Sequence, residues 1–391
     1  MKVLSINAGS SSMKFTAYEM PEENVLISGY IERIGIGDSF YTLKVNGDKV
    51  EKHVDVPDHK SAFEIVVEEL KAYNIVEFLN EIKAMGHRIV QGGSYFDKSV
   101  VVDDEVMAKI EELAPLAPLH NPAALVGIRA ALEVFPEALQ VVVFDTAFHQ
   151  TMEESKYLYA LPYEWCSKYN VRRFGAHGTS HKYVSMRANE ILGRSDTRLI
   201  TCHIGSGASI SAVVNGKCVN TSMGLTPNAG LIMGTRCGDI DATILPYMIR
   251  KGFSVDELDT IMNKKSGFLG ISGKYSDARD IVYGCESGDE RCILARDMFI
   301  DRIVDYIAKY YFEMGGCDMI VFTAGMGEKS RPFRTEIMKR LGVIGIHLDE
   351  DANEKCFGVE SMISTADSKI PCYVIPTDEE VMIARDAYNL L

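Results

Sequence analysis

The chain lacks the features that would direct it into a membrane or out of the cell. No apolar run approaches the ~18 residues that a membrane-spanning helix needs. The amino terminus shows no charged-then-apolar leader with a cleavage site, because the first residues already resemble a strand. The nine cysteines include no C-x-x-C pair, a pattern typical of reduced and mostly buried thiols. We therefore expect a cytoplasmic protein without a membrane contact.

The sequence also lacks the basic excess of a nucleic-acid-binding protein. Acidic residues outnumber basic ones by 55 to 41, and the formal net charge is −14. This balance argues against nucleic acid and anionic membranes as partners, although a small phosphorylated ligand needs only a few local cations. The pair His177 and His181 lacks the glutamate of H-E-x-x-H, so a zinc site of that kind is not expected.

Two familiar nucleotide motifs are missing as well. The sequence contains no G-x-x-x-x-G-K-[ST] loop. Gly205-Ser206-Gly207 is not a dinucleotide fingerprint, because the third glycine is absent and a strand rather than a helix follows. A nucleotide site in this chain must therefore be built in another way.

What is present predicts a large α/β protein with two domains. At 391 residues, with 47% hydrophobic and 25% charged residues, the chain is globular and too long for one ordinary core. Each half opens with a strand, a Gly-Ser turn and a second strand, at 3–15 and again at 199–214. No Pro-rich or Ser-rich linker separates the halves, so we expect a compact hinge and two turns that face each other across a cleft.

The first Gly-Ser turn, residues 8–12, has two interpretations. Backbone N–H groups and hydroxyls of such a turn can surround a phosphate, and Lys14 adds a compact cation nearby. Glycine and serine are also common in plain hairpin turns, so the turn alone does not establish a ligand.

Several polar residues follow apolar runs, where strands are expected to end. They are Asn7, Arg88, Asp145, His203 and the loop after Thr323. Ligands collect at the carboxyl ends of strands in α/β sheets, so the set predicts a site although each member alone could be a solvated strand end. Asp145 and Glu379 are the carboxylates best placed for a divalent cation, and Asn7 could orient one of its waters.

Two arginines and one histidine are the candidates for binding an anion. Arg88 and Arg236 are each flanked by glycines, which allow a ligand to approach the backbone, and a guanidinium matches carboxylate or phosphate oxygens. The alternative for Arg236 is a structural ion pair with Asp239 or Asp241. His177 fits a loop in which it donates to an anion while Ser180 caps the next helix; the alternative is a satisfied surface histidine.

Taken together, eleven segments in order along the chain resemble the acetate kinase family, within the superfamily of acetate and sugar kinases, Hsp70 and actin. The segments are N-A-G-S-S-S at 7–12, G-H-R-I-V at 86–90, A-P-L-H-N-P at 117–122, F-D-T-A-F-H at 144–149, H-G-T-S-H-K-Y at 177–183, C-H-I-G-S-G at 202–207, T-S-M-G at 221–224, G-T-R-C-G-D-I-D at 234–241, N-K-K-S-G at 263–267, F-T-A-G at 322–325 and I-P-T-D-E-E at 375–380.

The resemblance implies a fold, an activity and partners. The fold would be two ribonuclease-H-like (actin-like ATPase) domains with an interdomain cleft, comprising residues 1–147 plus 381–391 and residues 148–380. The activity would be reversible phosphoryl transfer between ATP and acetate, giving acetyl phosphate and ADP, with Mg²⁺ or Mn²⁺. The resemblance further implies a homodimer joined through the second domain and metabolic coupling to a phosphate acetyltransferase.

The resemblance also implies roles for individual residues. Asn7 and Glu379 would serve the metal, and Arg88 would bind the carboxylate or the moving phosphoryl group. His177 and Arg236 would stabilise the transition state. The apolar slot for the methyl group would be Val90, Leu119 and Pro227. The nucleotide and its phosphates would be held by Lys14, His203, Ile204, Gly205, Ser206, Gly207, Asp277, Ala278, Arg279, Gly325, Met326, Gly327, Glu328 and Lys329.

Physical chemistry supports direct in-line attack by the acceptor. A carboxylate is already ionised at neutral pH, so no base is needed to create the nucleophile. Bringing two anions together is the main difficulty, and positioning and electrostatics supply nearly all the catalysis. We therefore expect Asp145, among the catalytic residues, to orient a metal-bound water rather than to accept a proton.

Four positions depart from the family pattern. Ala176 stands where phenylalanine is expected beside the acyl slot, so a preference for propionate or butyrate is the alternative activity. Ser206 and Lys329 each replace an asparagine near the nucleotide, and Gln91 replaces a histidine. An actin-like or chaperone-like nucleotide switch would need no paired arginines, and a sugar kinase would need an Asp base with many hydroxyl-binding side chains.

Overall fold

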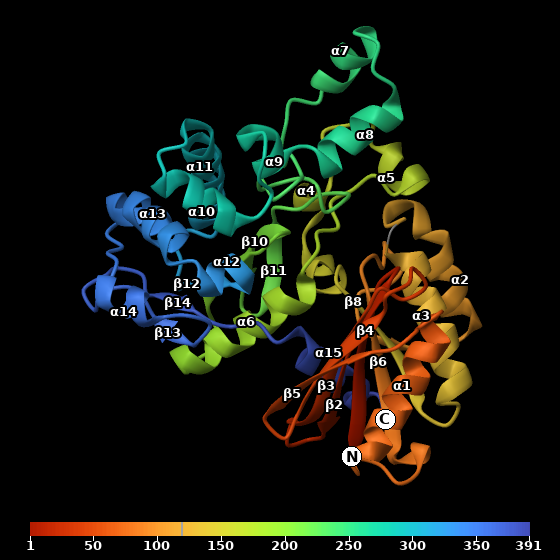
Figure 1. Ribbon diagram of the computed structural model, residues 1–391. Coiled ribbons are helices and arrows are strands. Elements are labelled where there is room, and N and C mark those ends of the chain that lie inside the picture. Colours follow the sequence, from red (N-terminus) through yellow and green to blue (C-terminus); the bar gives the residue numbers. More distant parts are fainter. Residues whose placement is uncertain (119) are drawn as a thin grey trace. The chain divides into compact units, whose positions relative to one another are not determined.

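The computed structural model describes residues 1–118 and 120–391, which divide into two compact units (Figure 1). Unit 1 comprises Met1–Phe148 and Asp378–Leu391, and unit 2 comprises His149–Thr377. Residue 148 and residues 378–380 thus group with unit 1, whereas the predicted division placed them in the second domain. Leu119, a predicted acyl-slot residue, lies outside the described residues.

Within the described residues, unit 1 contains an eight-stranded sheet in the order β5-β4-β3-β2-β1-β6-β8-β7. The strands β1 to β5 form an antiparallel meander, whereas β1, β6 and β8 are parallel and β7 is antiparallel to β8. Their bounds are β1 (Lys2–Ala8), β2 (Ser12–Glu19), β3 (Asn24–Glu32), β4 (Phe40–Val45), β5 (Asp48–His53), β6 (Ile82–Ile89), β7 (Val100–Val101) and β8 (Leu139–Phe144).

Helices cover both faces of this sheet. The helices α1 (His59–Ala72), α2 (Asp104–Glu112) and α3 (Asn121–Val134) accompany the short turns η1 (Leu79–Glu81) and η2 (Ala114–Leu116), and α15 (Glu379–Asn389) ends the chain. Leu4 and Met85 share the apolar core of α1 and α3. Gly86, the next residue on β6, points the opposite way, and a methyl group there would lie 2.5 Å from Ile383 Cγ2. The glycine therefore allows α15 to pack directly on β6.

Unit 2 repeats the core topology of unit 1. Its described residues form a six-stranded sheet in the order β11-β10-β9-β12-β14-β13. The strands β9, β10 and β11 are antiparallel neighbours, and β9, β12 and β14 are parallel. Their bounds are β9 (Arg198–Ile204), β10 (Ala208–Val214), β11 (Lys217–Thr221), β12 (Met319–Thr323), β13 (Ser361–Met362) and β14 (Cys372–Val374). The predicted strand-turn-strand opening of each half is confirmed by the antiparallel pairs β1–β2 and β9–β10.

The two faces of the unit 2 sheet differ in polarity. Ile200 and Cys202 of β9 join Phe299 and Ile303 of α11 in the apolar core, while the alternating position Thr201 is buried on the face of α6. The helices and turns of this unit are η3 (Ala147–Thr151, which begins in unit 1), α4 (Glu154–Tyr157), α5 (Glu164–Tyr169), α6 (Gly178–Leu192), α7 (Ile244–Arg250), α8 (Val255–Lys264), α9 (Gly267–Ser272), α10 (Ala278–Glu286), α11 (Glu290–Glu313), α12 (Ala324–Lys329), α13 (Arg331–Leu341), η4 (Gly342–Ile344) and α14 (Glu350–Lys355).

The parallel strands determine where chemistry can gather. Because β1, β6 and β8 run the same way, their carboxyl ends at Ala8, Ile89 and Phe144 share one edge of the unit 1 sheet. In unit 2 the ends of β9 and β12, at Ile204 and Thr323, do the same. Among the described residues, none of the helices has the length and apolar character that crossing a bilayer requires.

Candidate active site

In unit 1, three predicted residues converge at the ends of the parallel strands. Arg88 lies near the end of β6, Asp145 follows β8, and Glu379 begins α15. The N–H of Asp145 donates to Ile89 O at 2.9 Å, which fixes the carboxylate beside β6. Arg88 Nη2 donates to Asp145 Oδ2, and Arg88 Nε lies 3.7 Å from Glu379 Oε2. The sequence placed Arg88 and Asp145 at strand ends and named Glu379 as a carboxylate for a divalent cation, and the structure brings the three side chains together.

The charges of Arg88, Asp145 and Glu379 influence one another, and one N–H of Arg88 has no hydrogen-bond partner among the described residues. Burial favours the neutral form of Arg88, but Asp145 and Glu379 outweigh it and raise the pKa of the guanidinium. Burial, together with Asp145 and Glu380, raises the pKa of Glu379 to about 7, although Arg88 and Lys14 act in the opposite direction. Arg88 Nε is buried and makes no hydrogen bond with the described residues. The cluster therefore holds an unused donor between two carboxylates.

The first Gly-Ser turn is tied into unit 1 by its own backbone. The N–H of Gly9 donates to Ser12 O at 2.8 Å, and Gly9 O lies 2.8 Å from His59 Nε2. Lys14 pairs across the β1–β2 ladder with Asn7, and its ammonium contacts the Glu380 carboxylate. The roles of Lys14 toward phosphate and of Asn7 toward a metal stay predictions.

In unit 2, His177 and Arg236 meet at the second Gly-Ser turn. His177 precedes α6 in the left-handed conformation, with φ of 59°. A methyl group on Gly207 would lie 3.3 Å from His177 Nε2 and 3.6 Å from Arg236 Nη1. The turn that contains Gly205 and Gly207 is thus bordered by an imidazole and a guanidinium, as an anion site requires.

Arg236 has no carboxylate partner among the described residues, so the alternative of a structural ion pair is wrong. Asp239 instead accepts from Tyr306 Oη at 2.6 Å, and Asp241 accepts from the N–H and the hydroxyl of Thr243. Burial lowers the pKa of Arg236 with no neighbouring acid to oppose the shift. A half-buried guanidinium without a counter-charge favours the arrival of an anion.

His177 is held by a buried polar network that we did not predict. Its Nδ1 lies 2.9 Å from Ser209 Oγ, which in turn lies 2.8 Å from His181 Nε2. The prediction that Ser180 caps α6 is wrong, because Ser180 is buried inside the helix and its hydroxyl lies 2.8 Å from His203 Nδ1. The sequence shows His181 only as half of a zinc motif, so its true partners on β9 and β10 were missed.

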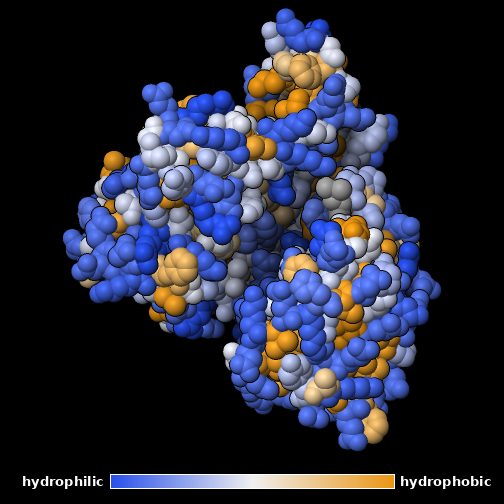
Figure 2. All heavy atoms as spheres, viewed as in Figure 1, coloured by the Kyte–Doolittle hydropathy of each residue, from blue (hydrophilic) through white to orange (hydrophobic). Residues whose placement is uncertain are grey.

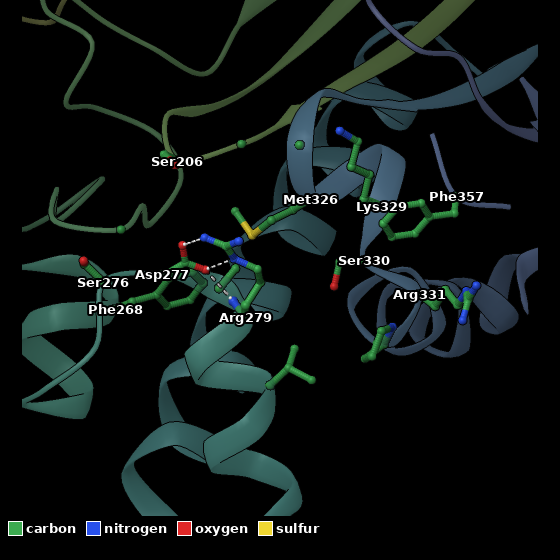
Figure 3. Close-up of a pocket in the computed structure, with 16 residues that line it drawn as sticks. Ser206, Phe268, Ser276, Asp277, Arg279, Met326, Lys329, Ser330, Arg331 and Phe357 are labelled. Carbon is green, nitrogen blue, oxygen red and sulfur yellow. Dashed lines mark hydrogen bonds and ion pairs between the residues drawn. The ribbon is translucent and has the colours of Figure 1, made fainter. Parts of the chain in front are cut away.

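A cavity of about 600 Å³ in unit 2 collects most of the predicted nucleotide residues (Figure 3). Those that line it are Gly205, Ser206, Asp277, Ala278, Arg279, Gly325, Met326 and Lys329. The predicted residues that do not line it are Lys14, His203, Ile204, Gly207, Gly327 and Glu328. The lining residues that the sequence did not indicate are Gly234, Phe268, Ser276, Val282, Ser330, Arg331, Pro332 and Phe357.

The side chains of two predicted nucleotide residues, Arg279 and Glu328, point in directions that the sequence does not indicate. Arg279 forms a two-pronged ion pair with Asp277, at 3.0 and 2.7 Å, and its side chain is 90% exposed (Figure 3). Glu328, by contrast, turns its carboxylate toward the protein, accepting from Ala324 N at 2.8 Å and from Thr377 N at 3.1 Å. Arg279 is thus an exposed side chain at the cavity, whereas Glu328 stabilises the β12–α12 junction.

The predicted acyl-slot residues, and the positions Ala176 and Gln91 that differ from the family pattern, are divided between the two units. Val90 belongs to unit 1 and Pro227 to unit 2, where Pro227 O accepts from Arg236 Nη1 at 3.1 Å. Ala176 is buried in the unit 2 core, and its carbonyl lies 2.9 Å from His149 Nε2. Gln91 is buried, and its side chain accepts from Gly93 N at 2.9 Å, which stabilises the loop after β6.

Comparison with known proteins covers nearly the whole chain. The family described as the Acetokinase family matches residues 2–385. An acetate kinase of Bacillus cytotoxicus is 52% identical, covering 100% of this chain and 98% of the relative, and that of Bacillus subtilis strain 168 is 51% identical, covering 100% and 99%.

Solved structures agree with these matches. The acetate kinase of Porphyromonas gingivalis is 47% identical with a TM-score of 0.93, covering 100% of this chain and 99% of that one. A propionate kinase of Francisella tularensis is 41% identical with a TM-score of 0.94 and full coverage of both chains. These similarities confirm the predicted fold class of ribonuclease-H-like, actin-like ATPase domains.

Proposed function

This chain belongs to the acetokinase family and is a kinase whose acceptor is a carboxyl group, and we propose that it catalyses reversible phosphoryl transfer between ATP and acetate. The products are acetyl phosphate and ADP. One observation carries the proposal: Arg236, which has no carboxylate partner in the described part of the chain, lies with His177 at a turn whose Gly205 and Ser206 also line the 600 Å³ cavity.

Unit 2 supplies the donor half of the reaction. We assign the nucleotide to the cavity and its terminal phosphate to the turn at 205–207. Arg236 and Nε2 of His177 then donate to the oxygens of the moving phosphoryl group, where negative charge is spread during transfer. Fixed donors of this kind act most strongly where water is excluded, and burial already partly desolvates Arg236.

Unit 1 supplies the acceptor half. Arg88 Nε has an unused hydrogen, which suits a carboxylate oxygen of acetate or an oxygen of the transferring group. The acceptor carboxylate needs no base, so Asp145 and Glu379 do not have to remove a proton from it.

The oxygen donors of unit 1 fit a divalent cation. Asp145 and Glu379 both approach Arg88, and Asn7 adds an amide at the end of β1. Two carboxylates together with phosphate oxygens and water suit Mg²⁺ or Mn²⁺. Such an ion would neutralise phosphate charge when bound, while Arg88 orients the carboxylates that hold it.

Acetate is the first choice of acceptor, and propionate is the second. Alanine at position 176 is smaller than the phenylalanine expected there, which favours an acid longer than acetate. One solved relative bears the name propionate kinase. A matrix of ATP, GTP and pyrophosphate against acetate, propionate and butyrate, with Mg²⁺, tests both. We expect the highest kcat/KM for ATP with acetate; a higher value for propionate would replace the first choice.

We further propose a homodimer formed through unit 2. Exposed apolar side chains gather around α7 and its flanking loops, at the top of the view in Figure 2. They include Ile244, Tyr247 and Ile249, which are 45%, 55% and 46% exposed. Sedimentation equilibrium should give twice the 43.4 kDa chain mass, and Tyr247→Glu should give the monomer. A monomeric unaltered enzyme would refute this.

The cellular setting follows from the same chemistry. All nine cysteines are free, which supports a reducing compartment such as the cytoplasm. Acetyl phosphate must be supplied or consumed by an acyl-transferring enzyme, so we propose metabolic coupling to a phosphate acetyltransferase.

The decisive experiment removes the charge of Arg236. Arg236→Gln should lower kcat by about 10²–10³-fold, the loss typical of one transition-state donor. Arg194→Gln is the matched control, because Arg194 lies on the surface of unit 2, where it pairs with Asp196 and Asp318. Turnover that survives in folded Arg236→Gln would contradict the proposed function.

A further inference from the structure

His177 lies at the end of a chain of buried hydrogen-bonding groups. His181 is fully buried on α6, and its Nδ1 lies 2.7 Å from Thr201 Oγ1 on β9. Its Nε2 lies 2.8 Å from Ser209 Oγ on β10, and that hydroxyl lies 2.9 Å from His177 Nδ1. Three hydrogen bonds therefore connect Thr201 to His177 through a layer that solvent does not reach.

The hydroxyl of Ser209 couples the two rings. This hydroxyl carries one hydrogen, and its two neighbours in the series of hydrogen bonds are Nδ1 of His177 and Nε2 of His181. If Ser209 donates to His177, it must accept from His181, and the reverse also holds. The protonation site of one histidine therefore determines that of the other.

His181 is held in its neutral form. Burial and the neighbouring rings of His149 and His203 keep its pKa well below the ordinary value. A neutral imidazole has one N–H, so when Thr201 donates to Nδ1 of His181, the hydrogen of His181 lies on Nε2 and points to Ser209. Ser209 then donates to Nδ1 of His177, and the hydrogen of neutral His177 lies on Nε2.

The opposite order of donors places the hydrogen of neutral His177 on Nδ1. When His181 donates to Thr201, Ser209 donates to His181 and accepts from Nδ1 of His177, so Nε2 carries a hydrogen only if the ring is protonated. The guanidinium of Arg236, on the other side of Gly207, disfavours that second positive charge. Thr201 Oγ1 lies 2.7 Å from Nδ1 of His181 but 3.5 Å from Ser211 O, its other acceptor. Its single hydrogen therefore favours the shorter contact with His181, which gives the first order.

We propose that Ser209 and His181 are positioning residues that hold neutral His177 in the tautomer with hydrogen on Nε2, directed at the turn 205–207. This inference rests on the proposed role of His177 in phosphoryl transfer. Neither residue contacts the cavity that we assign to the nucleotide.

A second histidine at the site is held in the same manner. His203 stacks on His177, with ring centroids 4.0 Å apart and an interplanar angle of 18°. Its Nδ1 lies 2.8 Å from Ser180 Oγ, and that oxygen accepts from Thr377 Oγ1 at 2.8 Å. With its oxygen occupied by Thr377, Ser180 donates to His203, which places the hydrogen of neutral His203 on Nε2 as well.

The test combines a spectroscopic signature with kinetics. In enzyme labelled with ¹⁵N-histidine, two-bond ¹⁵N–¹H correlations should show His177 as the Nε2–H tautomer. Ser209→Ala should convert it to a mixture of tautomers and lower kcat about 3- to 10-fold, the value of one neutral hydrogen bond, with little change in either KM. Ser211→Ala is the matched control, because Ser211 is equally buried on β10 but bonds Thr221 rather than a histidine.

A second variant keeps the test decisive if Ser209→Ala folds poorly. Thr201→Val preserves shape, lies two hydrogen bonds beyond Ser209, and should move the His177 resonances in the same direction by less. Unchanged His177 resonances in the folded variants would overturn the relay. Altered tautomers with unchanged kcat would uphold the relay and refute the proposed role of His177 in catalysis.

Discussion

Replacement of Asp145 by asparagine separates a metal-orienting role from a proton-accepting one. The variant keeps an oxygen that can accept from Arg88 Nη2 but loses the charge of a fully buried carboxylate. A hydrogen bond between charged groups contributes about 1.5–3 kcal/mol and a neutral one about 0.5–1.5 kcal/mol. Glu379, 3.7 Å from Arg88 Nε, still balances the guanidinium. We therefore expect the free energy of unfolding to fall by about 1–2 kcal/mol, measured by urea denaturation with circular dichroism.

The kinetics of the same variant carry the mechanistic conclusion. With one of two carboxylates removed, the Mg²⁺ concentration for half-maximal activity should rise at least about 10-fold. The acid limb of the pH–rate profile should persist, displaced to lower pH, because Asp145 helps to raise the pKa of Glu379. Loss of the acid limb with unchanged Mg²⁺ dependence would refute this reasoning and make Asp145 the proton acceptor.

Two further predictions concern the stability of unit 1. Gly86→Ala should destabilise the protein by about 1–3 kcal/mol in urea, because the added methyl group would meet Ile383 Cγ2 at 2.5 Å; Gly342→Ala, with open space around it, should be nearly neutral. Burial lowers the pKa of His87 to about 4 in the folded protein. As the pH falls from 6.5, this histidine therefore becomes protonated in the unfolded chain before it does so in the folded protein. His87 should then remove up to about 3 kcal/mol of stability between pH 6.5 and pH 4, and His87→Asn should flatten that part of the stability–pH curve; an unchanged curve would refute the assignment.

The sequence predicts the framework of both units and the residues at their strand ends. Apolar runs that end in Arg88, Asp145 and His203 are local signals. Parallel pairing of strands within each sheet then brings Arg88 and Asp145 to one edge of the unit 1 sheet, and places His203 beside Thr323 at one edge of the unit 2 sheet. The partners of His181 could not be predicted in this way, because Thr201 and Ser209 are common strand residues whose meaning appears only when β9 and β10 pack on α6.

The sequence likewise predicts only part of the lining of the unit 2 cavity. Its glycines and Asp277 belong to short motifs, whereas Phe268 and Phe357 come from segments that resemble ordinary core and loop. The inward turn of Glu328 likewise depends on two backbone N–H groups, of Ala324 and Thr377, which lie far apart in the sequence. Contacts of this kind depend on packing between segments that are distant in the sequence, so a short sequence motif cannot predict them.

The two arginines show how one repeated topology can serve two purposes. Arg88 is surrounded by acids that raise its pKa, so its cluster can hold a cation and still offer one donor to an anion. Among the residues that the structure describes, Arg236 faces no acid, and burial lowers its pKa, so its guanidinium would gain most from the arrival of a phosphate. Transfer between two anions needs both properties, because the acceptor must be held close to charge-compensated groups while the moving phosphoryl group meets uncompensated positive charge. The difference between the two arginines supports our proposal of an acceptor half in unit 1 and a donor half in unit 2.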